Sequence, residues 1–249
     1  MFRHQGKSRT LQHNLRIAII LSFVAGIVNV TGFLSIKQLT TNVTGHFALF
    51  INDVSNLEFW KGTIYFLYIF SFLFGSFSSG FLIEKIRETK KLNVFVLPII
   101  IESFILVTIA GLSHFNGYLY PDLIACMLLF AMGLQNSYVT KISNAIVRTT
   151  HLTGLFTDLG IELSQLFFPK SHPNREKIKS TIKLRIYIIS FFFLGGLIGG
   201  FLYLRMGLQL NTLILGALIL LISLFYDDLR FRVIIARRKY QQKKRTLQR

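Results

Sequence analysis

The sequence has few of the residues from which soluble enzymes build their active sites. It contains one cysteine, its Asp and Glu together number 11, and only 16% of its residues are charged. The single Cys126 excludes an internal disulfide framework and, within an apolar run, is expected to be inert packing. The sequence also lacks a Gly-x-Ser-x-Gly nucleophile elbow, a phosphate-binding Gly-rich loop and a Cys/His pair. We therefore expect no enzyme activity and no cofactor.

Apolar residues dominate the chain instead. Hydrophobic residues make up 52% of the 249 positions, 25 residues are Phe, and the mean hydropathy is +0.52. Average soluble domains carry about 25% charged residues, well above the fraction found in this sequence. The composition therefore predicts an integral membrane protein.

The net charge of +17 has two interpretations. The basic tail around residues 237–245 has the composition of a nucleic-acid-binding arm. In multi-spanning membrane proteins, however, Lys and Arg gather in cytoplasmic segments, where they set the orientation and meet anionic lipid head groups. We favour the second interpretation and expect anionic lipids, rather than nucleic acid, at the basic face.

Helices that span a bilayer need about 20 mostly apolar residues. Two segments, Val43–Leu57 and Leu152–Phe168, are shorter than this and interrupted by polar groups, so they either span or re-enter. The first apolar run follows basic residues, as in a signal peptide, but it is long and has no small-residue cleavage site, so we interpret it as a retained helix. Six segments have sufficient length: Leu15–Ile36, Ile64–Ile83, Leu92–Leu112, Leu123–Val139, Ile186–Leu204 and Leu208–Phe225.

The distribution of basic residues favours six spans over eight. If the two short segments return to the side from which they came, 25 basic residues lie on one face and 3 on the other. If all eight segments span, the division is 20 to 8. Because cytoplasmic segments are rich in Lys and Arg, we expect six spans with both termini cytoplasmic. The expected regions are a basic N-terminus (1–14), one transmembrane domain (15–226) and a basic tail (227–249).

An internal repeat divides the transmembrane domain into about 15–113 and 121–226. Gly26–Asn29 aligns with Gly133–Asn136 at an offset of 107 residues, and Asn42–Gly45 aligns with His151–Gly154 at 109. Three spans in each half place the second copy upside down, as in many secondary transporters. The predicted fold is an all-α inverted 3+3 repeat with one re-entrant half-helix in each half. Small-residue clusters at 75–80 and 195–200 pack the halves together or form a homo-oligomer contact.

The polar stretch 147–162 and its fainter copy 41–47 carry the expected substrate site. Thr153 is a plausible N-cap for a half-helix whose free N–H groups point into the protein at membrane depth, and a second half-helix begins at Thr44–Gly45. Two such N-termini that converge form a site for an anion or a carboxylate. The expected substrate-binding residues are Asn42, Thr44, Gly45, Thr149, Thr150, His151, Thr153 and Gly154.

Two acids in the second half-helix are candidates for proton coupling. Asp158 and Glu162 are four residues apart and share one helix face, and His151 titrates near neutral pH, so the three residues form a candidate relay. In the competing interpretation one of the acids pairs with Arg148 as a structural ion pair. These residues and His46 are of metal-binding types, but no His-x-x-x-His spacing accompanies them, so we expect no metal. Four further polar residues either line a path or bridge helices: Asn29, Gln135, Asn136 and Glu102.

The runs Val147–Gly160 and Gly133–Asn136 closely resemble the signature of the YoaK-like family, bacterial multi-spanning proteins that form a domain of unknown function. The run Gly26–Leu34, followed by Thr44–Gly45, resembles the first-half pattern of that family. Relatives tend to have an Asp and a small residue where this chain has Asn29-Val30, and an Asn where it has His46. If those residues of the relatives contact a ligand, the ligand or the coupling of this chain differs. The resemblance implies a protein of the bacterial cytoplasmic membrane with six or so helices, and implies no substrate.

These observations predict a secondary transporter of a small molecule or ion, with a tilt toward anions or carboxylates. A channel or passive facilitator with the same pore is the first alternative. A non-transporting membrane component is the second, either an assembly partner or an intramembrane hydrolase built on His151 and Asp158. The hydrolase lacks an evident nucleophile.

Overall fold

A computed structural model describes residues 10–89, 94–112, 120–168, 174–226 and 229, and this part of the chain is helical without a β-strand. Five of the helices are long and apolar enough to cross a membrane; α4 is equally apolar but has 17 residues. The helices are α1 (Leu11–Ile36), α2 (Val43–Ser55), α3 (Phe59–Thr89), α4 (Val96–Leu112), α5 (Pro121–Ser143), α6 (Leu152–Gln165) and α7 (Arg175–Leu204), followed by the 3₁₀ turn η4 (Gln209–Asn211), with which a last helix begins that runs to Tyr226.

The predicted helices are all present, with ends that differ by a few residues. The first helix begins at Leu11, with Thr10 at its N-cap, so the expected N-terminal region 1–14 overlaps it. Helices α3 and α7 begin earlier than predicted because polar or charged residues at 59–63 and 175–185 continue the helix beyond the apolar run. Residues 1–9 and almost all of the tail 227–249 lie outside the described residues.

The two central helices are α1 and α5. Each of them packs along a helix from the other half of the sequence, α1 against α7 and α5 against α3. The residues in contact between α1 and α5 run in opposite order along the two helices. Gln135 donates a hydrogen bond to the carbonyl of Leu21, and Gly32 lies against Leu128. The central pair is therefore antiparallel.

Glycines allow the close approach of the helices in two pairs, α1–α7 and α3–α5, which are called the outer pairs below. In the α1–α7 pair, a Cβ added to Gly26 or to Gly195 would lie within 3.0 Å of backbone atoms of the partner helix. The same holds for Gly75 and Gly133 in the α3–α5 pair. Small residues at such crossings let helix backbones approach closely. The small-residue clusters of α3 and α7 therefore pack the two halves of this chain together, one of the two roles that the sequence left open.

The contacting positions in the two outer pairs correspond to each other in sequence. Gly26 and Gly133 are 107 residues apart, as are Phe23 and Phe130, whose carbonyls face Gly195 and Gly75. Gly75 and Gly195 are 120 residues apart, as are Phe72 and Phe192. Each pair is parallel, because residue numbers rise together along both helices at the contacts.

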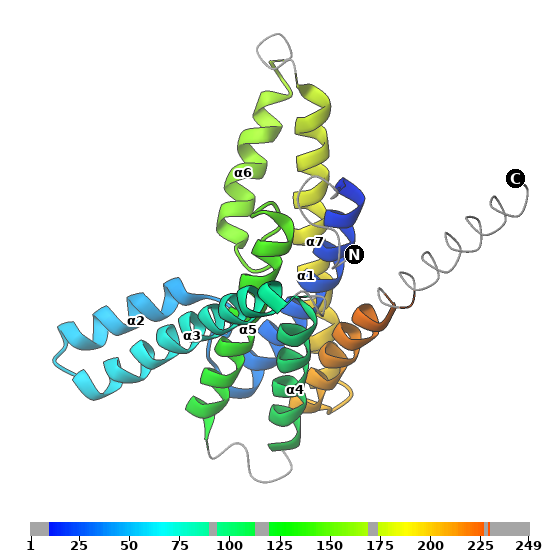
Figure 1. Ribbon diagram of the computed structural model, residues 1–249. Helices are drawn as coiled ribbons and strands as arrows, with labels where there is room; N and C mark the ends of the chain where they lie inside the picture. The colour runs from blue at the N-terminus through cyan, green and yellow to red at the C-terminus, as the bar shows by residue number, and fades with distance from the viewer. Residues whose placement is uncertain (1–9, 90–93, 113–119, 169–173, 227–228, 230–249) are drawn as a thin grey trace, which may run out of the picture.

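The short helices extend the bundle as two hairpins (Figure 1). Helix α2 lies against the first half of α3, and α6 lies against the first half of α7; the hairpins project from the bundle in different directions. Within each hairpin the helices are antiparallel, since Val54 of α2 is close to Gly62 while His46 stacks on Tyr65.

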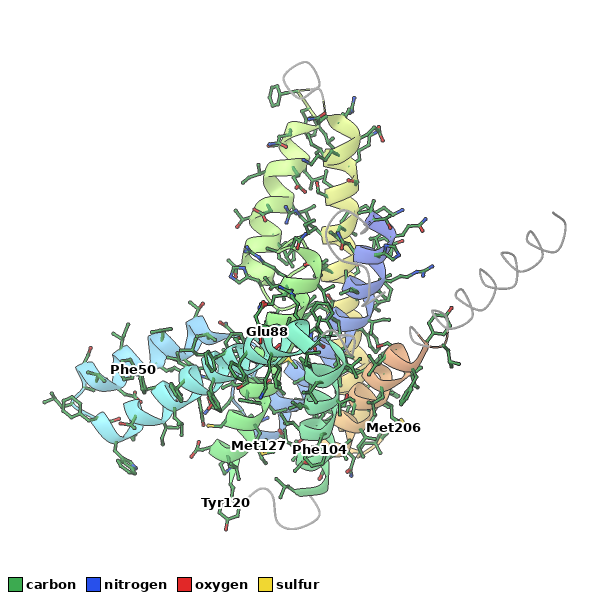
Figure 2. All side chains as sticks on the ribbon, viewed as in Figure 1. Phe50, Glu88, Phe104, Tyr120, Met127 and Met206 are labelled. Carbon is green, nitrogen blue, oxygen red and sulfur yellow. The ribbon has the colours of Figure 1, made fainter. Side chains whose placement is uncertain are left out.

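The outer surface of the bundle is apolar. Phe74, Phe77 and Phe81 of α3 are each about half exposed or more, and Phe104 on the outer face of α4 is 71% exposed (Figure 2). Exposed apolar area of this extent is unusual in soluble monomers. Together with the helix lengths, it identifies a multi-pass transmembrane protein.

Candidate functional site

After α5 the chain turns back along the helix it has just left. Asn144 and Ala145 both have positive φ (52° and 62°), and the Ser143 hydroxyl accepts a hydrogen bond from the backbone N–H of Val147 at 3.0 Å. The extended segment then passes back over two turns of α5, because Thr149 and Thr150 bond to side chains of that helix. Gln135, which bonds to Thr149, lies eight residues before the last residue of α5, and eight helical residues correspond to about 12 Å of rise. Helix α6 therefore starts beside the middle of α5 and not at its end.

Two amide side chains of α5 hold this returning segment. Gln135 Nε2 donates to Thr149 Oγ1 at 3.1 Å, and Thr150 Oγ1 donates to Asn136 Oδ1 at 2.9 Å. Gln135 and Thr149 are fully buried. The candidate path residues Gln135 and Asn136 therefore act as anchors of the segment; whether they also line a path stays a prediction.

The first half contains the same construction. Helix α1 ends at Ile36 with Lys37 in the left-handed region (φ 57°), and Thr41 Oγ1 then donates to Asn29 Oδ1 at 2.7 Å. Helix α2 begins next to this bond, and the Asn42 side chain caps it by accepting from the N–H groups of Thr44 (2.9 Å) and Gly45 (3.4 Å). The amide of Asn42 thus satisfies N–H groups that a ligand would otherwise bind.

The expected N-cap of the second half-helix is wrong by two residues. His151, not Thr153, occupies the N-cap position of α6, and its side chain makes no capping bond. The helix starts early because the His151 carbonyl already accepts from Leu155 N at 3.1 Å. Thr153 lies exposed in the first turn, and the first N–H groups of α6 receive no side-chain cap from His151.

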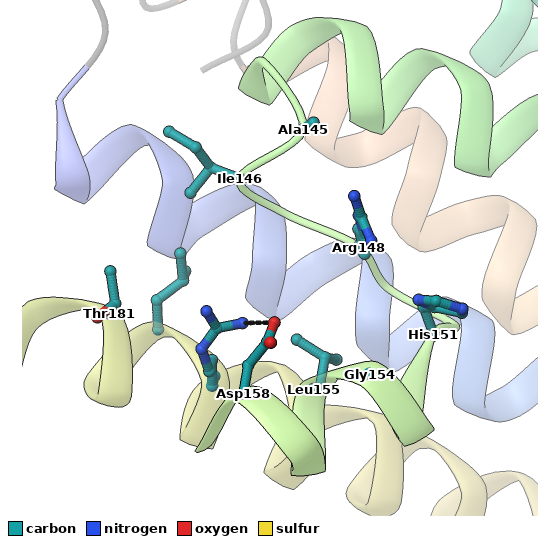
Figure 3. A pocket seen from close by; sticks show the side chains of 10 residues that line it. Ala145, Ile146, Arg148, His151, Gly154, Leu155, Asp158 and Thr181 are labelled. Carbon is teal, nitrogen blue, oxygen red and sulfur yellow. Dashed lines mark hydrogen bonds and ion pairs between the residues drawn. The ribbon is translucent and has the colours of Figure 1, made fainter. Parts of the chain in front are cut away.

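A cavity of about 250 Å³ lies between the returning segment, α6 and α7 (Figure 3). Arg148 and His151 enter it from the returning segment, Asp158 from α6 and Arg185 from α7. Arg148 forms no ion pair with another described residue. A guanidinium without a protein partner can bind a carboxylate or phosphate through two parallel hydrogen bonds, so the cavity is suited to an anion.

Arg185 holds both acids of α6. Its Nε and Nη2 donate to the two oxygens of Glu162 at 2.9 and 3.0 Å, and its Nη1 donates to Asp158 Oδ2 at 2.9 Å, the bond dashed in Figure 3. The structural pairing with Arg148 is therefore wrong in its partner: Arg185, 23 residues after Glu162, takes that place. Charge-assisted bidentate bonds offset the repulsion between neighbouring carboxylates. Proton coupling by Asp158, Glu162 and His151 stays a prediction.

The expected substrate-binding residues fall into two groups. Asn42, Thr44 and Gly45 lie at the start of α2, and the residues from Thr149 to Gly154 lie at the start of α6. The cavity takes its lining from the second group and not from the first. Convergence of the two half-helix starts on one ligand stays a prediction.

Several polar contacts between the described helices have no counterpart in the sequence patterns, including the following three. Tyr68 of α3 donates to Asp122 of α5, and Tyr138 of α5 donates to Glu102 of α4 at 2.7 Å. The third is the Arg185 cluster. Their partners are 23 to 54 residues apart, so no local spacing marks them. His46, which departs from the family pattern, is buried with Nε2 2.6 Å from the carbonyl of Leu39.

Sequence comparisons give one family and one curated relative. A family model described as "Protein of unknown function (DUF1275)" matches residues 17–226. The chain is similar to "UPF0700 transmembrane protein YoaK" of Bacillus subtilis (strain 168), with 26% identity over 176 residues that cover 68% of this chain and 77% of the relative. No solved structure matches.

Proposed function

The chain belongs to the family described as "Protein of unknown function (DUF1275)", and on its structure we propose that it is a secondary transporter of a small solute, with a preference for anions or carboxylates. The returning segment between α5 and α6 carries this proposal. It brings the start of α6 to one cavity beside the bundle, together with Arg148, which has no ion-pair partner among the described residues.

The proposed architecture is six spans in two inverted halves, with α2 and α6 as re-entrant half-helices. Helix directions support it. Helix α1 is antiparallel to α5, α5 is parallel to α3, and α2 is antiparallel to α3. Helices α1 and α2 therefore run in the same direction across the membrane. Successive helices that both crossed the membrane would run in opposite directions. The same reasoning gives α5 and α6 a common direction, so each short helix leaves on the side from which its chain segment entered.

The anion preference follows from the charges of the cavity. The N–H groups of the first turn of α6 and its positive dipole end favour a negative ligand. Arg148 adds a full positive charge, and His151 adds a second hydrogen-bond donor. An anion in the cavity also competes with Asp158 for Arg185, since that carboxylate is 52% exposed and bound by one hydrogen bond only. Ligand binding and the α6–α7 contact are thereby linked.

The proposed location is the bacterial cytoplasmic membrane, with both termini on the cytoplasmic side. In this orientation the hairpin of α6 and α7 lies on the cytoplasmic side, because the basic residues of α7 lie in its first part, from Arg175 to Arg185. Lys and Arg in such positions contact anionic lipid head groups. A homo-oligomer remains compatible with the apolar outer face of α3.

A ligand screen tests the proposed site. Purified protein is melted in detergent with phosphate, sulfate, succinate, an uncharged sugar or a zwitterionic amino acid, because a ligand that binds only the folded state raises the unfolding temperature. We expect one of the anions to stabilise the wild type, and Arg148→Gln and His151→Ala to remove that effect. Arg205→Gln is the matched control, since this exposed Arg lies outside the cavity.

Flux into proteoliposomes then decides the mechanism. A stabilising anion that accumulates against its gradient when a pH gradient is imposed supports secondary transport. Flux that only dissipates the anion gradient identifies a facilitator. An anion effect that Arg148→Gln leaves intact would place the binding site elsewhere and remove the basis of the proposal.

A further inference from the structure

Glu102 lies in the interior of the bundle and has no countercharge among the residues that the structure describes. Its side chain lies in α4 with no exposed surface, and its Oε2 accepts a hydrogen bond from the Tyr138 hydroxyl at 2.7 Å. Its other oxygen, Oε1, is buried without a hydrogen-bond partner among the described residues. Ionisable groups in this position within membrane helices are costly and are commonly functional.

The elements around α4 supply one titratable neighbour, Tyr138. Helices α3 and α5, the η4 turn and the last helix pack against α4. The η4 turn has no ionisable residue, and Tyr226 of the last helix is exposed. The other ionisable groups of α3 and α5 contact other partners or face outward. The contacts are Lys61 with Glu58, Tyr65 with His46, Tyr68 with Asp122, Lys141 and Arg87 with Glu84, and Lys85 with the ring of Phe81. The remaining three, Cys126, Glu88 and Tyr120, lie toward the surface or the α3–α5 contact.

This environment separates the two protonation states of Glu102. An ionised carboxylate would have a single hydrogen-bond donor and no cation, which is the most costly form of a buried acid. A neutral carboxyl fits better, yet its proton must then sit on Oε1, because Oε2 already accepts from Tyr138. The O–H on Oε1 has no acceptor in this conformation. Another arrangement of the helices, in which water reaches Oε1, would give the proton a partner and a way out.

The acids of α6 are less suited to this task. Glu162 and Asp158 share the Arg185 guanidinium, so each of them already has a positively charged partner. Sequence symmetry also sets Glu102 apart from the other half. Tyr138 corresponds to Thr31 at the offset of 107 residues, and the Thr31 hydroxyl is buried without a partner among the described residues.

We infer that Glu102 is the group that takes up and releases the coupled proton, with Tyr138 as its positioning residue. The inference rests on the proposed transport function and replaces the α6 acids as proton carriers. In one state a proton from water on one side forms the O–H bond at Oε1, and the carboxyl becomes neutral and buried. In the other state that O–H bond breaks, the proton passes to water on the opposite side, and the hydrated carboxylate remains.

Infrared difference spectra of purified protein at acid and alkaline pH test proton binding without any ligand. We expect a carboxyl C=O band of a buried acid, separate from the band of the exposed Asp and Glu side chains, that is present at acid pH and disappears at alkaline pH. It should be absent in Glu102→Gln, whose amide oxygen can still accept from Tyr138, and shifted in Tyr138→Phe. It should be unchanged in Glu88→Gln, which removes an exposed carboxyl of α3. A band that survives in Glu102→Gln, or that does not respond to pH in the wild type, overturns the inference.

Proton flux into proteoliposomes with an entrapped pH dye tests the coupling role. Phosphate, sulfate and succinate are the probes. We expect probe-dependent proton entry to be lost in Glu102→Gln and retained in Glu88→Gln, which removes an exposed carboxyl outside the cavity. Entry that persists in Glu102→Gln refutes the role of Glu102 and leaves transport standing. If no probe moves in the wild type, transport and coupling both fall, and the infrared result still decides whether Glu102 binds a proton.

Discussion

The close crossing of α1 and α7 makes a quantitative prediction about Gly195. A Cβ at this position would lie 2.8 Å from the carbonyl carbon of Phe23, whereas carbon atoms in contact prefer about 3.5–4.0 Å. The helices must therefore separate by roughly 1 Å along a crossing formed by backbone atoms. Overpacking of this kind costs about 1–3 kcal/mol, so Gly195→Ala should lower the free energy of unfolding by that amount.

The control is a glycine with free space around it. Nothing lies within 4 Å of a Cβ added to Gly160 in the middle of α6. Ala is about 0.8–1.0 kcal/mol more favourable than Gly in a helix interior, so Gly160→Ala should leave the protein as stable or stabilise it. Unfolding in detergent, followed by temperature or by titration with a denaturing surfactant, gives both values.

Double variants locate the effect in the crossing itself. Gly26 and Gly195 lie in one crossing, so the helix separation caused by the first Ala also accommodates the second. The double variant should therefore lose less free energy of unfolding than the two single variants added together. Gly75 and Gly195 lie in different helix pairs, so their costs should add. If Gly195→Ala is as harmless as Gly160→Ala, the described packing of α1 on α7 is wrong.

Three further predictions concern the site and the topology. Arg185→Gln should cost about 1–3 kcal/mol, because two carboxylates lose their charged donor; unfolding as stable as wild type would contradict the cluster. Gln135→Leu should cost about 1–2 kcal/mol by removing the donor to the buried Thr149 hydroxyl and the additional bond to the Leu21 carbonyl, and an unchanged unfolding temperature would refute the anchoring of the returning segment. In a Cys126→Ser background, Asn56→Cys and Phe168→Cys at the two hairpin tips should react with an impermeant thiol reagent from opposite sides of the membrane. Labelling of both from one side would exclude the inverted arrangement.

The helices could be predicted from the sequence because membrane spans are marked locally. An apolar run of about 20 residues is sufficient to indicate each one, and Gly26 and Gly133, which the sequence aligns at an offset of 107 residues, both lie at close helix crossings. The predicted segment Leu152–Phe168 begins where α6 begins, but its N-cap was missed because it depends on a tertiary feature: the hydroxyls of Thr149 and Thr150 are bonded to α5, which leaves His151 at the N-cap position.

Side-chain partners at the site could not be predicted in the same way. Asp158 had Arg148 ten residues before it and Arg185 twenty-seven after it, and only the antiparallel packing of α6 on α7 selects the second. Glu102 showed no basic neighbour in sequence, and the structure agrees, but its bond to Tyr138 depends on how α4 meets α5. Spacing along one helix identifies residues on a shared face, and it says nothing about which other helix that face meets.

The exchange of helices between the two halves has a consequence for synthesis. Gly26 meets Gly196 of α7 across 170 positions of chain, so α1 enters the membrane long before the ribosome has made α7. Contacts between distant parts of a chain form late and slowly, and surfaces that wait for a partner are where misassembly begins. The glycine face of α1 must stay open, or be shielded by lipid or an insertion factor, until most of the protein has been translated. Neither half can complete its own packing first, so assembly of this protein is committed only when α7 arrives.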